Sequence, residues 1–286
     1  MAIVLGSNRY GKAETRLVRV TRDGGTHRLK DVNVSISLSG AMRDVHLTGD
    51  NSAVLPTDTQ KNTVFAFAKK HGIAAIEDFG LLLARHFVAS QPAITHARVE
   101  IHEYGWRRIG GGHSFVRDGG EVRTALVHGD AEAETVVSGL ADLVVLNSTG
   151  SEFHGFARDE YTTLEPADDR VLATAVTARW RHRDTNAAWD ASYAAARDAL
   201  LKAFAETHSL SLQQTLYQMG RRVLEGRHGI CEIRLSLPNK HHFLVDLEPF
   251  GLKNDNEVYF AADRPYGLIE GTVRTDDAPD APSAWN

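Results

Sequence analysis

The sequence predicts an α+β protein built from two copies of one structural unit. The segment Phe67–His71 recurs 137 residues later as Phe204–His208. The strand patterns that follow these segments, Ile94–Ile101 and Ile230–Leu237, lie 136 residues apart, so the two copies stay in register through a helix and two turns. A repeat of this length indicates a tandem duplication of a domain rather than a solenoid.

The order of the elements supports the same fold class. In each half a hairpin precedes two helix patterns, and a second hairpin follows them. Strands in runs, then helices in runs, favour an α+β fold with antiparallel sheets over an alternating βαβ array. We therefore predict a first unit over residues 9–140 and a second over residues 141–274. Residues 275–286 are predicted to be a disordered tail, because this segment is acidic and rich in proline.

Apolar spacing identifies the elements of the first half. After a turn at Asp23–Gly25, apolar and polar residues alternate from Val32 to Leu38, which predicts a half-buried strand. From Ile76 to Phe87, large apolar residues recur every three or four positions, which predicts a helix. Gly110–Gly112 precedes a strand without the Gly-Lys-Ser/Thr ending of a phosphate loop, so a hairpin loop is predicted there.

The second half follows the same plan. Alternation from Leu172 to Trp180 predicts a strand, and the apolar face from Trp189 to Phe204 predicts a helix. Ser211 and Gln214 form a capping-box signature that opens a second helix. Its apolar stripe consists of Leu212, Leu216, Met219 and Val223. These stripes predict core packing rather than ligand contacts.

Composition excludes several classes of protein. The chain has 286 residues with 42% hydrophobic and 24% charged residues, which is ordinary for a globular protein. Its net charge of −5 comes without a basic run, so no nucleic-acid partner is expected. No apolar stretch approaches the roughly 20 residues of a membrane span, and Met1–Gly6 lacks the pattern of a secretory signal. Cys231 is the only cysteine, which fits a reducing compartment, and we expect a cytoplasmic protein.

Four short polar segments stand out along the chain: Arg9–Lys12, Pro56–Asp58, Gly155–Leu164 and Ser236–His241. Together they resemble the urate oxidase (uricase) family, over nearly the whole chain. The resemblance implies a tunnelling fold, with two units per chain and a helix pair on one face of each antiparallel sheet. It also implies a homotetramer that encloses a barrel-shaped tunnel, with active sites between subunits. Half-buried sheets with open edges independently favour such an assembly.

Lys12, Thr57 and Asp58 are the first candidate site residues. A lysine acts as a base near neutral pH only if burial or nearby cations lower its pKa, and from its type alone Lys12 could be a solvated lysine. Thr57 or Asp58 could equally cap the helix that follows. The resemblance implies that Lys12 is catalytic and that Thr57 relays a proton between the lysine and the substrate. Pro56 stands where several relatives have alanine.

Four further residues are candidates for binding a flat, anionic heterocycle. The resemblance implies that Phe153 stacks on urate, that Arg170 holds one edge through two hydrogen bonds, and that Gln213 holds another edge. The backbone N–H of Leu212 would act beside Gln213. Judged singly, Phe153 could be a core residue, Arg170 could form a surface ion pair, and Gln213 could be an exposed helix residue.

Asn239 and His241 lie in a predicted hairpin turn, where a Pro-Asn pair needs no functional explanation. The resemblance implies that Asn239 holds dioxygen and then water above the purine, and that His241 orients and deprotonates the attacking water. His241 and His242 do not indicate a metal site, because neighbouring strand residues point to opposite faces. No metal and no cofactor are expected.

The resemblance therefore implies oxidation of urate by dioxygen to 5-hydroxyisourate, with release of hydrogen peroxide, as the first step of urate degradation. Lys12, Thr57 and His241 would be the catalytic residues. Two alternatives remain open from the sequence. One is another tunnelling-fold enzyme acting on pterins or purines, such as a zinc-dependent cyclohydrolase. The other is a purine-binding oligomer without catalytic activity.

Overall fold

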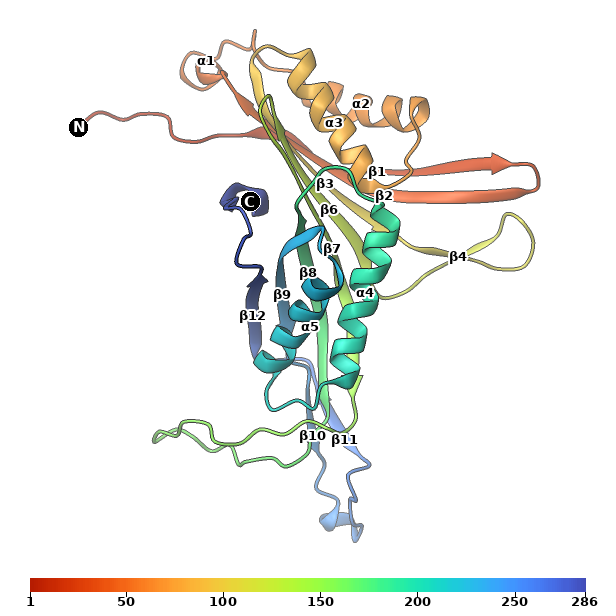
Figure 1. The fold of residues 1–286 in the computed structure, drawn as a ribbon, viewed down its shortest axis with the longest axis vertical. Helices are drawn as coiled ribbons and strands as arrows, with labels where there is room; N and C mark the ends of the chain where they lie inside the picture. Colours follow the sequence, from red (N-terminus) through yellow and green to blue (C-terminus); the bar gives the residue numbers. More distant parts are fainter. The chain divides into compact units, whose positions relative to one another are not determined.

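The computed structural model describes residues 1–286 and divides into two compact units, whose elements Figure 1 labels. Unit 1 comprises Met1–Gly139, Arg181–Asp190 and Pro279–Asn286. Unit 2 comprises Leu140–Trp180 and Ala191–Ala278. Each unit has its own hydrophobic core.

Unit 1 contains a sheet of long antiparallel strands in the order β1-β2-β3-β6. These strands are β1 (Tyr10–Asp23), β2 (Thr26–Gly40), β3 (Ile94–Tyr104) and β6 (Val122–Asp130). A small separate hairpin joins β3 to β6 in sequence and consists of β4 (Trp106–Arg108) and β5 (Phe115–Arg117). Its loop contains Gly110–Gly112, so the predicted hairpin loop is confirmed. β7 (Glu134–Asn147) begins in unit 1 and ends in unit 2.

Two helices pack on this sheet, α2 (Thr57–Lys70) on β1 and α3 (Ile76–Ser90) on β3 and β6 (Figure 1). A shorter helix, α1 (Arg43–Leu47), follows β2. The predicted apolar face of α3 is buried from Ile76 to Phe87 and meets the inward side chains of β2, including Val34 and Ile36. The apolar spacing of α3 and the alternation of β2 both arise because one face of each element lies in a shared core.

Unit 2 repeats the plan with α4 (Trp189–Glu206) and α5 (Leu212–Gly226), the first two residues of α4 belonging to unit 1. Ser211 caps α5 by accepting the N–H of Gln214 at 3.1 Å, as the capping signature predicts. The side chain of Gln214 in turn accepts the N–H of Leu210 at 2.8 Å. The sheet strands of unit 2 are β8 (Leu172–His182, whose last two residues belong to unit 1), β9 (Ile230–Pro238) and β12 (Leu268–Arg274).

The strand after β9 differs from the prediction. We expected a hairpin turn at Ser236–His241, but β9 pairs with β12, while β10 (His241–Leu244) pairs with β11 (Tyr259–Ala262). The backbone explains the difference. Asn239 donates its N–H to the carbonyl of Gly267 and Lys240 donates to that of Ala173, both at 2.8 Å, so this segment is tied to other parts of unit 2 rather than folded back on β9. A short 3₁₀ helix, η1 (Glu248–Phe250), lies between β10 and β11.

The chain's last residues also differ from the prediction of disorder. They form a 3₁₀ helix, η2 (Pro282–Trp285), in which Trp285 is 8% exposed and packs with Leu126 and Val137. Arg98 Nε donates to the carbonyl oxygen of Asn286 at 2.6 Å. An acidic, proline-rich composition predicts disorder on average, but one large aromatic side chain supplies enough apolar surface to anchor a short segment.

No helix of the chain combines the length and the apolar character that crossing a bilayer requires.

Candidate active site

The predicted site residues fall into two groups, one in each unit. Unit 1 carries Lys12 on β1 and Thr57 and Asp58 at the start of α2. Unit 2 carries the remaining six residues: Phe153, Arg170, Leu212, Gln213, Asn239 and His241.

Lys12 lies beside an irregularity in β1. The pairing of β1 with β2 shifts between Lys12 and Thr15, so Ala13 and Glu14 lie opposite the single residue Ser35. Glu14 adopts the left-handed conformation with φ of 55° and donates its N–H to Oγ of Ser35 at 3.0 Å. This is a β-bulge, a device that often re-aims side chains next to functional sites.

The bulge decides on which face of β1 the lysine lies. Thr15 is buried and Leu17 packs against the core of unit 1. Strict alternation back from these residues would place Ala13, and not Lys12, on the core side. The extra residue resets the alternation, so Lys12 shares a face with Tyr10, which packs against the same core.

Gly11 is required by close packing. A Cβ atom at this position would lie 1.8 Å from the carbonyl oxygen of Ile36, the residue that pairs with Lys12. Only glycine lets β1 approach β2 at this point. The Tyr-Gly-Lys sequence therefore has a structural reason for its central residue.

Thr57 and Asp58 occupy the first turn of α2, and no side chain caps the helix at Pro56. The alternative in which either residue serves as a cap is therefore wrong. The Asp58 carboxylate accepts hydrogen bonds from Lys61 and from Nδ2 of Asn62, the latter at 3.0 Å. The hydrogen bond from Lys61 is the main cause that holds the pKa of Asp58 below its usual value, and the charge of Lys12 contributes to the same effect. Lys12 is therefore within electrostatic range of the start of α2.

A cavity of about 300 Å³ in unit 2 brings together four of the six predicted residues. Phe153, Arg170, Asn239 and His241 line it, together with residues of β10, β11 and the loop before β8. Leu212 and Gln213 lie in the first turn of α5 and are not among its lining residues; Leu212 is buried and Gln213 is exposed.

Phe153 is held in place by contacts on its ring and on its backbone. Its ring stacks on Phe156 with centroids 5.1 Å apart and an angle of 10° between the planes. The guanidinium carbon of Arg170 lies 5.1 Å from the Phe153 centroid. Phe153 and Ala167 also exchange two backbone hydrogen bonds, of 2.8 and 3.1 Å. Phe153 is half-buried and belongs to the cavity wall rather than to the core.

Arg170 is desolvated, and burial lowers its pKa. Its Nε donates to the hydroxyl of Ser151 at 3.3 Å, and Ser151 is fully buried. The neighbouring Asp169 instead accepts the hydroxyl of Thr149 at 2.6 Å and the N–H of Gly150 at 2.9 Å. The hydrogen bonding of Asp169 is therefore directed at the 149–150 turn, and the guanidinium of Arg170 lines the cavity.

Asn239 follows β9, and His241 begins β10. The His241 ring lies parallel to that of Phe243, with centroids 5.7 Å apart and 20° between the planes. Nδ1 of the next residue, His242, is 2.9 Å from the carbonyl of Lys240, so that nitrogen serves the local backbone as a donor. Tyr259 on β11 completes this wall and was missed by sequence reasoning, because only the β10–β11 pairing, in which it lies opposite Leu244, brings it to the cavity.

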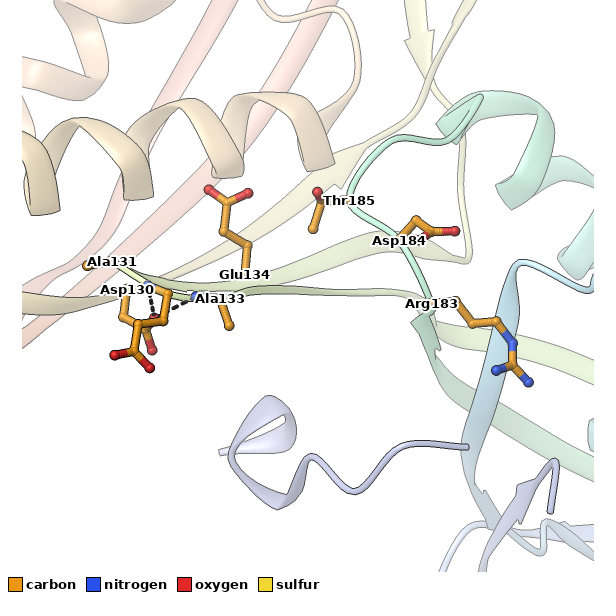
Figure 2. A pocket seen from close by; sticks show the side chains of 8 residues that line it. Asp130, Ala131, Ala133, Glu134, Arg183, Asp184 and Thr185 are labelled. Carbon is orange, nitrogen blue, oxygen red and sulfur yellow. Dashed lines mark hydrogen bonds between the residues drawn. The ribbon is translucent and has the colours of Figure 1, made fainter. Parts of the chain in front are cut away.

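A second cavity, of about 410 Å³, lies in unit 1 at the turn between β6 and β7 (Figure 2). None of the predicted residues lines it. Two of its acidic groups have partners: Asp130 accepts two backbone N–H groups at 2.8 Å, and Glu134 forms two hydrogen bonds of 2.6 Å with Arg85. The unit 2 cavity is therefore the candidate site.

The two groups of residues suit different tasks. A desolvated guanidinium beside an aromatic ring recognises a flat anion, through paired hydrogen bonds to one edge and stacking on the plane. The unit 1 group, an amine and a threonine hydroxyl, suits proton transfer, because the hydroxyl both donates and accepts.

Comparisons with known proteins all give one family. A sequence model of the uricase family matches residues 8–128 and 136–270. The uricase of Arthrobacter globiformis is 52% identical over 285 residues, which is 99% of this chain and 94% of that protein. The uricase of Danio rerio is 38% identical over 281 residues, which covers 92% of each chain.

Solved structures are similar over the same extent. The crystal structure of uricase from Arthrobacter globiformis has a TM-score of 0.97 at 52% identity and covers 100% of each chain. A urate oxidase structure from Bacillus sp. TB-90 has a TM-score of 0.81 at 26% identity, over 94% of this chain and 100% of that one.

Proposed function

This chain belongs to the uricase family and is a urate oxidase, and we propose that it oxidises urate through residues of both units. The observation that carries the proposal is the unit 2 cavity, in which Arg170 lies over Phe153 and which Asn239 and His241 also line. As in the family, the enzyme is a cofactor-independent oxidoreductase. The reaction consumes urate, dioxygen and water and yields 5-hydroxyisourate and hydrogen peroxide.

Urate binding rests on the groups that line the cavity. Urate is a flat anion with carbonyl oxygens and ring N–H groups along its rim. Arg170 donates two parallel hydrogen bonds to one edge, while Phe153 stacks on the ring. The amide of Gln213 and the backbone N–H of Leu212 hold a second edge. Desolvation of Arg170 strengthens its attraction for the anion.

Proton removal is assigned to the unit 1 group. Lys12, acting through the Thr57 hydroxyl, takes a proton from bound urate and gives an electron-rich dianion. Asp58 lies beside Thr57 and within the electrostatic reach of Lys12, and it completes the polar rim. The dianion itself reduces dioxygen, so the protein supplies position and charge rather than redox power.

The second half of the reaction uses Asn239 and His241. Asn239 holds dioxygen above the purine plane, oxygen adds at C5, and the peroxide leaves. Water then takes the same place, where His241 and Thr57 orient and deprotonate it for attack on C5.

We further propose that the active enzyme is a homotetramer in which Lys12 and Thr57 come from one subunit and the Phe153–Arg170 clamp from another. Exposed apolar side chains on the β10–β11 hairpin, Phe243 at 55% and Phe260 at 63%, support burial by a second chain. Gel filtration with activity across a dilution series tests this, and full activity in a monomer peak would overturn the shared site. We also propose a cytoplasmic location, which the single cysteine supports and cell fractionation would check.

Replacing Lys12 with methionine tests the catalytic proposal. The rates of urate absorbance loss and of oxygen uptake, both measured after chelator treatment, should fall at least about 100-fold. General base catalysis contributes a factor of about 10² to 10⁴ to the rate. Binding of a non-reactive purine analogue should persist, because the clamp lies in unit 2. Lys69→Met, in the last turn of α2, is the matched control and should behave as the wild type. A Lys12→Met enzyme of normal speed would refute the assignment.

A further inference from the structure

Tyr10 links the strand of Lys12 to the loop of Thr57. Its hydroxyl donates a hydrogen bond to the carbonyl oxygen of Leu55 at 3.0 Å, across 45 residues of sequence. Tyr10 precedes Lys12 by two residues on the same face of β1, and Leu55 precedes Thr57 by two residues. One hydrogen bond therefore connects the two backbone segments that carry the amine and the hydroxyl.

This hydrogen bond is in a protected environment. Tyr10 and Leu55 both pack against the core of unit 1. Burial raises the pKa of the Tyr10 phenol, although the bond to Leu55 opposes that rise, so the phenol stays protonated and able to donate at neutral pH. A hydrogen bond shielded from water keeps its geometry better than an exposed one.

The Leu55 carbonyl has a second donor. Nε2 of Gln60, a fully buried side chain of α2, lies 3.3 Å from the same oxygen. The N–H of Gln60 also donates to the carbonyl of Pro56 at 3.2 Å. Tyr10 of β1 and Gln60 of α2 thus both donate to the carbonyl oxygen of Leu55, two residues before Thr57. The ring of Pro56, which lies between Leu55 and Thr57 in sequence, restricts the backbone further.

The other end of the link is equally constrained. Gly11 packs directly on the backbone of Ile36, and the bulge after Lys12 is tied to Ser35. Tyr10 and Lys12 therefore lie in one stiff segment of β1. A shift of the Leu55 carbonyl relative to Tyr10 would change the separation between Lys12 and Thr57.

We propose that Tyr10 is a positioning residue of the reaction, which sets the separation between Lys12 and Thr57 through its hydrogen bond to Leu55. The inference rests on the proposed roles of Lys12 and Thr57. Proton transfer needs donor and acceptor atoms about 2.6–3.2 Å apart, and a misplacement of about 1 Å can cost on the order of 100-fold in rate. In this role the phenol acts through the separation of Lys12 and Thr57, so its effect is on the rate and not on urate binding.

Tyr10→Phe removes the hydroxyl and keeps the ring in the core. We expect kcat to fall by about 5- to 50-fold, within the range that misplacement allows. The KM for urate and the Kd of a non-reactive purine analogue should stay within about twofold of the wild type, since Phe153 and Arg170 are unchanged. Tyr217→Phe is the matched control: Tyr217 lies on α5, is 52% exposed, and should lose nothing when its hydroxyl is removed.

A double-mutant cycle separates positioning from a general loss of structure. In a Thr57→Ala background the hydroxyl that Tyr10 positions is absent, so adding Tyr10→Phe should reduce kcat no further. Equal losses in both backgrounds would overturn the proposal. If Tyr10→Phe does not fold, Tyr10→Met also removes the hydroxyl while keeping apolar bulk, and it should lower kcat with KM unchanged; normal kcat in that variant would overturn the proposal too.

The proposed function and this inference fail in different ways. An inactive wild type, or a fully active Lys12→Met variant, contradicts the proposed function. An active wild type and an impaired Lys12→Met variant, together with normal kcat in Tyr10→Phe, contradict only the role of Tyr10.

Discussion

Replacing Phe156 with leucine is expected to weaken urate binding while leaving kcat nearly unchanged. Phe156 does not line the cavity, but its ring stacks on Phe153 at 5.1 Å and 10°, so it supports the ring that urate would stack on. Leucine keeps the apolar bulk and removes the flat partner. Phe153 then gains freedom to tilt, and part of the binding free energy is used to restore its orientation.

The expected magnitude follows from the stack itself. An offset-stacked aromatic pair is worth about 0.5–1.5 kcal/mol beyond the area it buries. At 1.36 kcal/mol per factor of ten, this corresponds to an increase of about two- to twelvefold in the KM for urate. Because a stacking platform contacts the ground state and the transition state alike, its loss raises KM with little effect on kcat.

Steady-state urate oxidation and titration with a non-reactive purine analogue measure both quantities. The analogue's Kd should rise by the same factor as KM. Arg158→Met is the control, because Arg158 lies over the Phe156 ring at 5.6 Å and its removal leaves the two phenylalanines stacked. Wild-type KM and Kd in Phe156→Leu, or a fall in kcat at constant KM, would refute the reasoning.

Three further predictions concern stability. Trp285→Ala should lower the free energy of unfolding by about 3 kcal/mol and expose the C-terminal residues to proteases, because a buried aromatic anchor is lost; a resistant C-terminus would contradict this. The pKa of Glu100 falls from 4.5 to about 2, mainly through its hydrogen bond with His102, so its stabilisation is present above pH 4.5 and is lost as pH falls through about 2. Since Glu100 is one-third exposed, Glu100→Gln should cost only about 1 kcal/mol at pH 7, with the difference from wild type shrinking between pH 4.5 and 2 in denaturant titrations. Glu14→Gly should raise the free energy of unfolding by about 0.5–1 kcal/mol by relieving the left-handed backbone, whereas Glu14→Ala should not; equal effects would contradict the strain.

The fold class was predictable because each half of the chain repeats the same simple patterning. Alternation from Val32 to Leu38 and helical spacing from Ile76 to Phe87 both reflect a single buried face. The pairing of β9 with β12 was not predictable from such local signals. A Pro-Asn turn fits a hairpin equally well, and only backbone hydrogen bonds to distant residues redirect the chain at Lys240.

Four residues that line the unit 2 cavity were predictable, but the groups that support them were not. Family resemblance assigned Phe153, Arg170, Asn239 and His241, and these four line one cavity. The hydrogen bond between Tyr10 and Leu55 joins residues that share no pattern. The buried Ser151 hydroxyl behind Arg170 and the Phe156 ring behind Phe153 were equally undetectable, because their roles depend on three-dimensional neighbours rather than on spacing.

The irregularity at Ala13–Glu14 has a consequence for how this strand tolerates change. If these same residues paired with β2 in unbroken alternation, without the extra residue bulging out, Thr15, Leu17 and the rest of the strand would stay where they are. Tyr10 and Lys12 would both be turned to the reverse side of the ribbon. A regular strand of this length would keep its fold and yet lose its amine from the reaction centre, whereas deleting one codon would remove the bulge and leave the amine on its present face.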